Sequence, residues 1–389
     1  MRGGETAVGG EFDARQWRKR FPVFENKIYL NSCSYGAVAT DVRAAYEAYL
    51  TDREREGSYW DHWVGQNEEL RASIARLLGA TPAEIAITAS LSAGLNALVS
   101  SLDFSGKRNK VILSDLEFPT VGQIWHAQKR RGARVEIAAR EGGRVPIENF
   151  EALIDDETLI VSITHVSYKN GARNDIPAIV ALARRHGAMV MLDSYQAMGT
   201  FPISPQTLDV DFLAAGVLKY LLGSAGLAFL YVRQDMIGKL EPLATGWFAQ
   251  KDIFAMDHTA NEPADDARRF EAGTPPVPNV YAALAGLKII HEVGLENIEA
   301  HVRGLTARVK QRALDEGFTL ATPTDPAAHG AMIALKSTDM VELTQRLERE
   351  DIVTSYRDGN LRISPHFYNI EDDIDATMAA LVRHRDLLA

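Results

Sequence analysis

The sequence predicts an α/β protein with a mainly parallel sheet of seven strands, helices on both faces of the sheet and a smaller C-terminal α+β domain. Three observations lead to this prediction. Short apolar runs alternate with amphipathic helical stretches, no long linker interrupts the alternation, and the pattern changes to longer helices after about residue 273. Runs that are apolar throughout are typical of strands buried on both faces, as in a parallel sheet covered by helices.

Seven short apolar runs are expected to form the sheet. They lie at 84–88, 110–114, 134–138, 159–164, 188–193, 210–215 and 227–232. Helical stretches at 92–102, 120–132 and 176–187 follow the first, second and fourth runs. The last of these has Pro177 in its first turn and Gly187 at its end, which are the residues favoured at those helix positions.

The C-terminal part is expected to form helices at 281–293 and 297–316, then short strands and two more helices. We therefore divide the chain into an N-terminal arm at 1–28, a large domain at 29–274 and a small domain at 275–389. The arm is expected to pack with the small domain, and its first ten residues are expected to be flexible.

Composition excludes several classes of protein. Of the 389 residues, 42 are basic and 52 acidic, giving a net charge of −10 with no lysine or arginine block, so nucleic acid is not an expected partner. The hydrophobic share of 46% is that of a globular chain rather than a disordered one. No apolar run approaches the ~18 residues of a membrane span, and we expect no membrane partner. The single cysteine, Cys33, cannot form an internal disulfide, which indicates a cytoplasmic protein.

Two polar residues stand at the carboxyl ends of predicted strands, where open α/β sheets bind ligands. Asp193 ends an apolar run, and a buried carboxylate needs a cation or hydrogen-bond donors. Lys219 follows the next run in an apolar segment, where desolvation would lower the pKa of its amine and make it nucleophilic. Taken singly, each residue also has an ordinary structural explanation, as a capping carboxylate or as a lysine whose amine reaches solvent.

Two further features belong to the same edge of the sheet. Ser90 and Ser92 precede a helix whose free N–H groups could bind an anion, and Phe118 follows the second strand with an aromatic face. An anion site, a ring face, a carboxylate and an amine are the four parts that pyridoxal 5'-phosphate (PLP) requires. Their convergence therefore predicts a PLP site, although each feature alone is weak.

The chain resembles the fold type I PLP-dependent enzymes, and specifically the class V aminotransferase superfamily, over nearly its whole length. This superfamily includes cysteine desulfurases, kynureninases and isopenicillin N epimerase-like proteins. The resemblance is carried by YLNSCSYG, LDSYQAMGTFPI, LKYLLGSAGLAFLYV, RFEAGTPPVPN and LRISPHFYN. It implies the PLP-dependent transferase fold, PLP as the cofactor and an enzymatic function.

The resemblance also implies residue roles. Lys219 would be the Schiff-base lysine, Asp193 would hold the pyridine nitrogen, and Gln196 would contact the ring hydroxyl. Thr274 would reach the phosphate in a neighbouring subunit, which implies a homodimer with shared active sites. Arg362 would bind the substrate carboxylate through its guanidinium fork. The remaining expected cofactor contacts are Ser90, Leu91, Ser92 and Phe118.

The sequence differs from individual members of the superfamily at positions that reduce the number of expected reactions. The segments 91–92, 117–120, 165–171 and 246–248 resemble kynureninases, but Ala249 and Gln250 stand where those enzymes usually show Gly-His. Cysteine desulfurases stack a histidine on the cofactor and carry a cysteine before the C-terminal arginine, whereas this chain has Phe118 and no cysteine in 352–362. The hydroxyl or imidazole that the family often places just before the lysine is missing, because Gly216, Val217 and Leu218 stand there. We therefore expect fewer side chains on the phosphate and weaker cofactor binding.

The expected function is that of an aminotransferase or Cβ-lyase acting on a small-molecule amino acid with a free carboxylate. An isopenicillin N epimerase-like epimerase and a kynureninase-like hydrolase are the alternatives, and a cysteine desulfurase is disfavoured. Candidates for the substrate shell are Asn31, Tyr35, Tyr168 and Trp247, with Arg357 and His366 as further candidates. A dehydrogenase is not supported, since no G-x-G-x-x-G follows the first strand. The presence of both Asp193 and Lys219 argues against a catalytically silent scaffold.

Overall fold

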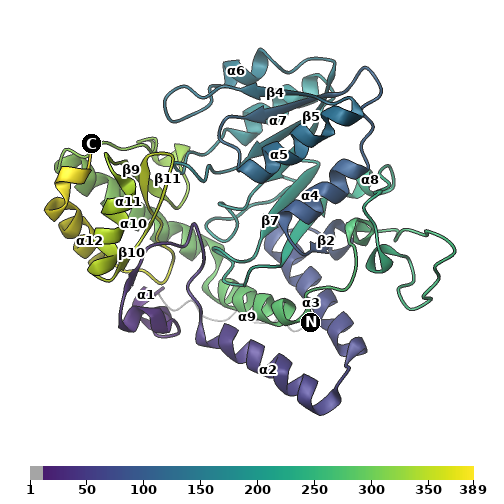
Figure 1. Cartoon of the computed structure of the whole chain (residues 1–389), viewed down its shortest axis with the longest axis horizontal. Coiled ribbons are helices and arrows are strands. Elements are labelled where there is room, and N and C mark those ends of the chain that lie inside the picture. Colours follow the sequence, from purple (N-terminus) through teal and green to yellow (C-terminus); the bar gives the residue numbers. More distant parts are fainter. Residues whose placement is uncertain (1–11) are drawn as a thin grey trace, which may run out of the picture.

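The computed structural model describes residues 12–389, and its centre is a seven-stranded sheet (Figure 1). The strand order is β2-β8-β7-β6-β5-β3-β4, and β8 alone runs antiparallel to its neighbours. This confirms the predicted mainly parallel sheet. The strands are β2 (Ile85–Thr88), β3 (Lys110–Ser114), β4 (Arg134–Ala138), β5 (Thr158–Thr164), β6 (Met189–Asp193), β7 (Phe212–Gly216) and β8 (Ala228–Val232). Each lies within two residues of its predicted run.

Helices cover both faces of this sheet. One face packs against α4 (Leu91–Ser100) and α5 (Pro119–Ala127), whose buried Leu95 and Trp125 join the apolar side chains of the strands. The other face packs against α3 (Trp60–Leu78), α7 (Ile176–Arg185) and α9 (Val277–Val293). Asp175 caps α7 by accepting a hydrogen bond from the Ala178 amide at 3.1 Å. The short helices α6 (Ile147–Glu151) and α8 (Gln234–Ile237) lie in connections.

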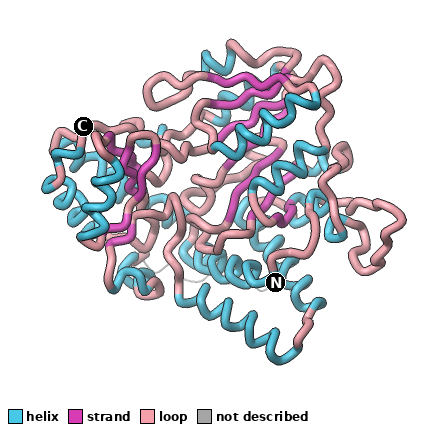
Figure 2. Tube along the Cα trace, viewed as in Figure 1, coloured by secondary structure: helices cyan, strands magenta, loops and turns pink. Residues whose placement is uncertain are grey.

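The C-terminal part forms a second, smaller sheet with its own helices (Figure 2). Its antiparallel order is β11-β12-β9. Its elements are α10 (Leu295–Asp315), β9 (Ile333–Lys336), α11 (Met340–Arg349), β11 (Ser355–Arg357), β12 (Asn360–Ile363) and α12 (Glu371–Arg383). The boundaries proposed at 28/29 and 274/275 stay a prediction.

The N-terminal segment runs alongside this small sheet. Strand β1 (Ile28–Tyr29) pairs in parallel with β10 (Ile352–Val353). Helix α1 (Ala14–Arg18) is joined to α12 by an ion pair of 2.7 Å between Arg18 and the buried Asp373. The flexible arm expected over the first ten residues lies outside the described residues.

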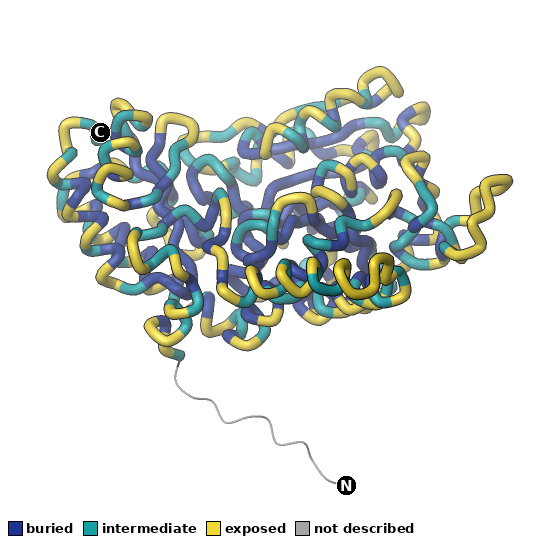
Figure 3. Tube along the Cα trace, turned by 60° about the horizontal axis from the view of Figure 1, so that its bottom comes forward, coloured by how far each residue is buried: buried dark blue, intermediate teal, exposed yellow. Residues whose placement is uncertain are grey.

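Two long helices were not predicted from the sequence, namely α2 (Thr40–Glu56) and α3. The sequence of α2 has little apolar periodicity. Only Val42 is buried in this helix, and most of its surface is exposed (Figure 3). It is held by packing against α9 rather than by an amphipathic pattern of its own. The helices predicted at 281–293 and 297–316 begin earlier, at Val277 and Leu295. Among residues 12–389, no helix combines the length and apolar character needed to cross a membrane.

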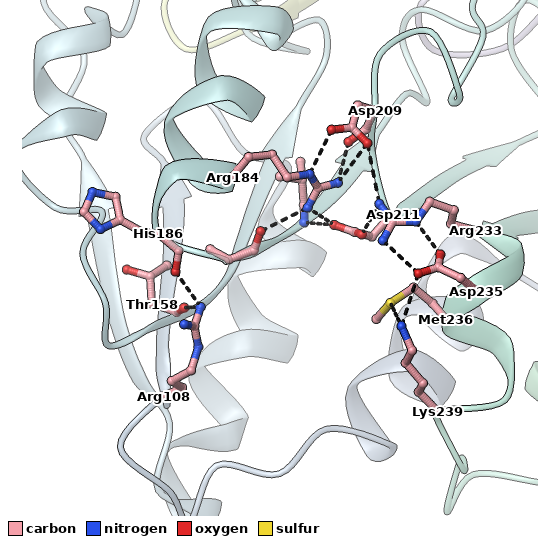
Figure 4. Close-up of polar contacts among 12 residues, drawn as sticks. Arg108, Thr158, Arg184, His186, Asp209, Asp211, Arg233, Asp235, Met236 and Lys239 are labelled. Atoms are coloured by element: carbon pink, nitrogen blue, oxygen red, sulfur yellow. Dashed lines mark hydrogen bonds and ion pairs between the residues drawn. The ribbon is translucent and has the colours of Figure 1, made fainter.

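A network of charged side chains lies at the amino-terminal ends of β6 and β7, on the side of the sheet away from their carboxyl ends (Figure 4). Asp211 is buried directly before β7 and forms ion pairs with Arg184 and Arg233, both at 2.8 Å. It also accepts a hydrogen bond from the Val190 amide of β6 at 2.6 Å. One carboxylate thus holds two strands and the C-terminal end of α7 together.

Replacing Asp211 by alanine is expected to lower the free energy of unfolding by about 3 kcal/mol or more, since two guanidinium groups lose a buried partner. Asp235→Ala removes an exposed partner of Arg233 and is expected to cost less than about 1 kcal/mol. Equilibrium denaturation of both variants measures the difference. Equal effects would show that Asp211 carries no special share of the stability.

Candidate active site

A cavity of about 300 Å³ opens at the carboxyl ends of the parallel strands. The structure brings eight of the predicted residues into its lining, namely Ser90, Leu91, Ser92, Phe118, Tyr168, Asp193, Gln196 and Lys219. It adds Ser34, Thr120, Thr164, Tyr195 and Leu218, to which the sequence analysis gave no role. These side chains come from segments far apart in the chain, and the sheet edge is what places them together.

Asp193 is the last residue of β6 and is buried. Burial raises the pKa of its carboxyl group to about 6, against the opposing effects of the Tyr195 amide and the charge of Lys219. Its Oδ1 accepts the Tyr195 amide hydrogen at 2.9 Å, while Oδ2 has no hydrogen-bond partner among residues 12–389. One carboxylate oxygen is therefore available to a protonated ring nitrogen, which would favour the ionised form.

Lys219 lies three residues after the end of β7. Burial lowers the pKa of its amine to about 8, although Cys33 and Asp193 act in the opposite direction. Its Nζ lies 4.5 Å from the ring centroid of Tyr195 and 5.9 Å from that of Phe118, and it donates no hydrogen bond within the described part of the chain. Near neutral pH a fraction of this amine is neutral, which a nucleophile or general base requires.

A close backbone approach fixes the turn that carries the lysine. The Gly36 amide donates to the Leu218 carbonyl at 2.9 Å, and a Cβ atom on Gly36 would lie 2.2 Å from the Lys219 carbonyl oxygen. Only glycine fits at this contact. The segment around Cys33 and Ser34 therefore packs directly beside the lysine turn.

The N-terminus of α4 provides an anion site. Ser90 is its N-cap and accepts the Ala93 amide hydrogen at 3.1 Å. The amides of Leu91 and Ser92 have no acceptor among residues 12–389. These N–H groups lie at the positive end of the helix dipole, and the hydroxyls of Ser90 and Ser92 are beside them.

These groups fit PLP. The α4 amides suit its phosphate, Phe118, which is 43% exposed, offers a ring face, and the free oxygen of Asp193 suits its pyridine nitrogen. Gln196 donates one hydrogen from Nε2 to the Cys33 carbonyl at 3.0 Å and keeps a second for a ring hydroxyl. The Lys219 amine completes the set.

Arg362 lies behind the cavity wall. It is a buried residue of β12, and its Nη1 donates to the Tyr168 carbonyl at 2.8 Å. Its Nη2 donates to the hydroxyls of Ser34 and Ser355, both at 2.9 Å. Its Nε is buried without a partner among residues 12–389. The guanidinium thus touches two residues of the lining and retains unused donors.

Besides Arg362, four predicted residues do not line this cavity. The Tyr35 hydroxyl bonds to Ser224 at 2.9 Å, and Asn31 forms a backbone bridge with Ser364. Trp247 packs on Trp60 at 5.7 Å between ring centroids and lines another cavity, beside the exposed loop at 251–262 that projects from the molecule (Figure 3). Thr274 lies in the loop before α9. Their functional roles stay predictions.

The two further shell candidates also lie outside the lining. His366 is buried, with its Nε2 hydrogen-bonded to the Tyr220 carbonyl at 2.9 Å. Arg357 is exposed, and its Nη1 donates to the Tyr356 carbonyl. His165 is buried behind Asp193, to whose carbonyl its amide donates at 2.8 Å.

Sequence reasoning missed the buried carboxyl group of Glu117. Its Oε1 accepts from the Ser114 hydroxyl at 2.6 Å and from the Thr164 amide at 2.8 Å. Its Oε2 is buried without a partner among residues 12–389. Burial raises the pKa of Glu117 to about 8, and the charge of Asp193 contributes in the same direction. The available signal was its position between a strand end and Phe118.

Comparisons with known proteins identify relatives over most of the chain. Residues 34–376 match the family model described as Aminotransferase class-V. The uncharacterized aminotransferase YcbU of Bacillus subtilis is 35% identical, covering 92% of this chain and 95% of that protein. A kynureninase of Geobacillus thermodenitrificans is 27% identical, covering 90% of this chain and 86% of that protein.

Among solved structures, a mutant of C-DES with glycine covalently linked to its PLP cofactor superposes with a TM-score of 0.86. The two chains are 22% identical, and the match covers 94% of this chain and 98% of the other. This likeness confirms the predicted fold type.

The buried Glu117 predicts a pH-dependent stability. Its pKa is about 8 in the folded chain and 4.5 ordinarily, so between these values the folded state retains a proton that the unfolded state has released. The free energy of unfolding should therefore fall as the pH rises through this window. Glu117→Gln mimics the protonated form and should remove this part of the slope.

The measurement compares melting midpoints of the cofactor-free protein at about pH 5.5 and about pH 8.5. The variant should lose less stability than the wild type on going to the higher pH. Glu54→Gln, on the exposed face of α2, serves as the control. Parallel behaviour of the wild type and Glu117→Gln would contradict the assignment.

Proposed function

Because the chain belongs to the class-V aminotransferase family of PLP-dependent enzymes, we propose that it is an aminotransferase or Cβ-lyase acting on an amino acid with a free carboxylate. The observation that carries this proposal is one cavity that holds the Lys219 amine, the Asp193 carboxylate and the free amides of α4. The similarity to YcbU, named an aminotransferase, supports the transferase reaction.

Each residue has a distinct task in the proposed reaction. Bound PLP supplies an electron sink for the bonds to the Cα atom of an amino acid. Lys219 holds the cofactor and then, as a neutral amine, takes the proton from Cα. Asp193 would keep a proton on the ring nitrogen, and the hydrogen bond from the Tyr195 amide favours its ionised form. Phe118 would cover a face of the cofactor ring and limit the access of water to it.

Arg362 is proposed to bind the substrate carboxylate. A guanidinium can donate two parallel hydrogen bonds to a carboxylate. Both hydrogens of the Arg362 Nη2 are donated to Ser34 and Ser355, so the substrate would displace one of these hydroxyls, while the bond from Nη1 to the Tyr168 carbonyl keeps the group oriented. Burial strengthens such a pair because little water competes for the donors. The amino group of the substrate would then be directed toward the lysine side of the cavity.

A kynureninase-like hydrolase is the second candidate, because a named kynureninase aligns over 90% of this chain. The departure at Ala249 and Gln250 weighs against it. An epimerase-like reaction uses the same lysine and carboxylate and differs only in how the proton returns to Cα. Product analysis separates these reactions.

Lys219→Ala should abolish the absorbance band that the cofactor gives when bound through the lysine without added amino acid, and all product formation, because no other amine among residues 12–389 lines the cavity. Lys239→Ala, at an exposed ion pair with Asp235, should retain both. The assay incubates the wild type with single amino acids and measures keto acid, released β-substituent, inverted amino acid and cleaved side chain. Turnover by Lys219→Ala would refute the assigned role, and keto acid or β-substituent from the wild type would support the leading reaction.

We also propose a homodimer in which Thr274 of one subunit contacts the phosphate in the other. The exposed loop at 251–262 and the aromatic surface of Trp60 and Trp247 are available to a second copy. The buried ion pair of 2.6 Å between Arg71 and Glu271 anchors the segment that leads to Thr274.

Mixing subunits tests this arrangement. Lys219→Ala and Thr274→Ala dimers should each be impaired, and hybrids should hold one site with both native residues. Random exchange at equal amounts makes half of the dimers hybrid, so about a quarter of the wild-type activity should appear. Mixing without any recovery, although exchange is verified by mass, would place Thr274 in its own subunit's site or outside it.

A further inference from the structure

The Tyr195 side chain lies across the end of β7. A Cβ atom built on Gly216 would lie 2.0 Å from the Tyr195 hydroxyl oxygen and 2.2 Å from Cζ. Any other residue at 216 would therefore collide with this tyrosine. The phenol occupies the space that a side chain at position 216 would fill, three residues before Lys219.

The Tyr195 side chain lies between Lys219, Gly216 and the apolar cluster that includes α4. The Lys219 Nζ lies over the ring of Tyr195, 4.5 Å from its centroid, whereas the hydroxyl lies over Gly216. The ring packs against the apolar cluster that contains Leu91 and Leu95 of α4. Tyr195 also lines the same cavity as Ser90 and Ser92. The ring thus faces the amine, and the oxygen lies at Gly216 within the segment that leads to Lys219, in a residue that shares the cavity with the start of α4.

The hydroxyl is a free donor. It has no hydrogen-bond partner among residues 12–389, although the ring is largely buried. Burial raises the pKa of Tyr195 above its ordinary value, and the charge of Asp193 acts in the same direction. The phenol therefore stays protonated across the working range of pH and can donate to an anion.

We propose that the Tyr195 hydroxyl donates a hydrogen bond to the phosphate of PLP, in place of the side chain that Gly216 lacks. The proposal rests on the proposed function, since it takes the amides of Leu91 and Ser92 as the phosphate site. It revises the expectation of weak cofactor binding drawn from Gly216, Val217 and Leu218. The missing donor is supplied from the turn after β6 rather than from β7.

The ligand chemistry follows from the donor set. A phosphate dianion accepts several hydrogen bonds, and the site offers two backbone amides, the hydroxyls of Ser90 and Ser92 and this phenol. A phenol held by its ring packing adds a donor with little further loss of conformational freedom. The contribution of Tyr195 should accordingly depend on the phosphate and not on the pyridine ring.

The test compares PLP with pyridoxal, which lacks the phosphate, in equilibrium titrations of the cofactor-free enzyme. Tyr195→Phe keeps the ring and removes only the oxygen. Its dissociation constant for PLP should rise roughly 10- to 100-fold, as expected for a hydrogen bond to a charged group, with pyridoxal binding unchanged. Inorganic phosphate should also compete less well with PLP in the variant.

A matched control is Tyr231→Phe. This change on β8 removes a buried hydroxyl that donates a hydrogen bond to Glu84 at 3.1 Å, and it should leave the dissociation constants of PLP and pyridoxal unchanged. The double variant Tyr195→Ala with Gly216→Ser returns a hydroxyl from the β7 side. It should bind PLP more tightly than Tyr195→Ala alone, again without an effect on pyridoxal.

The outcomes are distinguishable. Equal losses for PLP and pyridoxal would place Tyr195 on the ring or the lysine and overturn the proposal, as would unchanged binding of both. If the wild type itself formed no visible complex with PLP, the proposed function would fail and this inference with it. If the wild type binds PLP and Tyr195→Phe binds it equally well, the inference is overturned while the proposed function stands.

Discussion

Burial of a carboxylate and an amine at the same edge of the sheet is the constraint on which the rest of the site depends. Strands β6 and β7 are neighbours, with Asp193 paired to Ala214 in the register, so their carboxyl ends place Asp193 and the Lys219 turn side by side. Desolvation raises the pKa of Asp193 and lowers that of Lys219, whereas in water both groups would be fully charged. The shifted pKa values of both residues therefore come from their burial by other segments of the chain.

Several distant segments provide that cover. The segment after β1 reaches the lysine turn because Gly36 allows contact with the Lys219 carbonyl oxygen. The same segment pairs with the small domain through β1 and β10, and Arg362 of β12 bonds to Ser34 within it. The small sheet thus contributes to the wall of a cavity that is built mainly on the large one. On the opposite edge, Asp211 holds β6 and β7 in register.

The apolar runs predicted the seven strands within two residues, because strands buried on both faces must be apolar throughout. The pattern failed for α2, whose side chains are mostly exposed and whose stability comes from contact with α9. Asp193, Lys219, Ser90 and Phe118 could be selected as strand-end residues. Glu117 and Tyr195 stood in the same segments but could not be assigned, since nothing local indicates that a glutamate is buried or where a phenol points.

The sequence by itself determined the seven strands of the large sheet and the chemical types at their ends, because these follow from local apolar runs and from the residues after them. The quoted motifs carried the resemblance to the family. Only the tertiary structure decided that Tyr195 fills the space over Gly216, that Glu117 is desolvated and that Arg362 lies behind Ser34 and Tyr168. The contacts of Tyr195 and Arg362 join residues about 20 to more than 300 positions apart in the chain, and the desolvation of Glu117 is a consequence of burial. Such properties depend on how the elements pack against each other, which no single segment specifies.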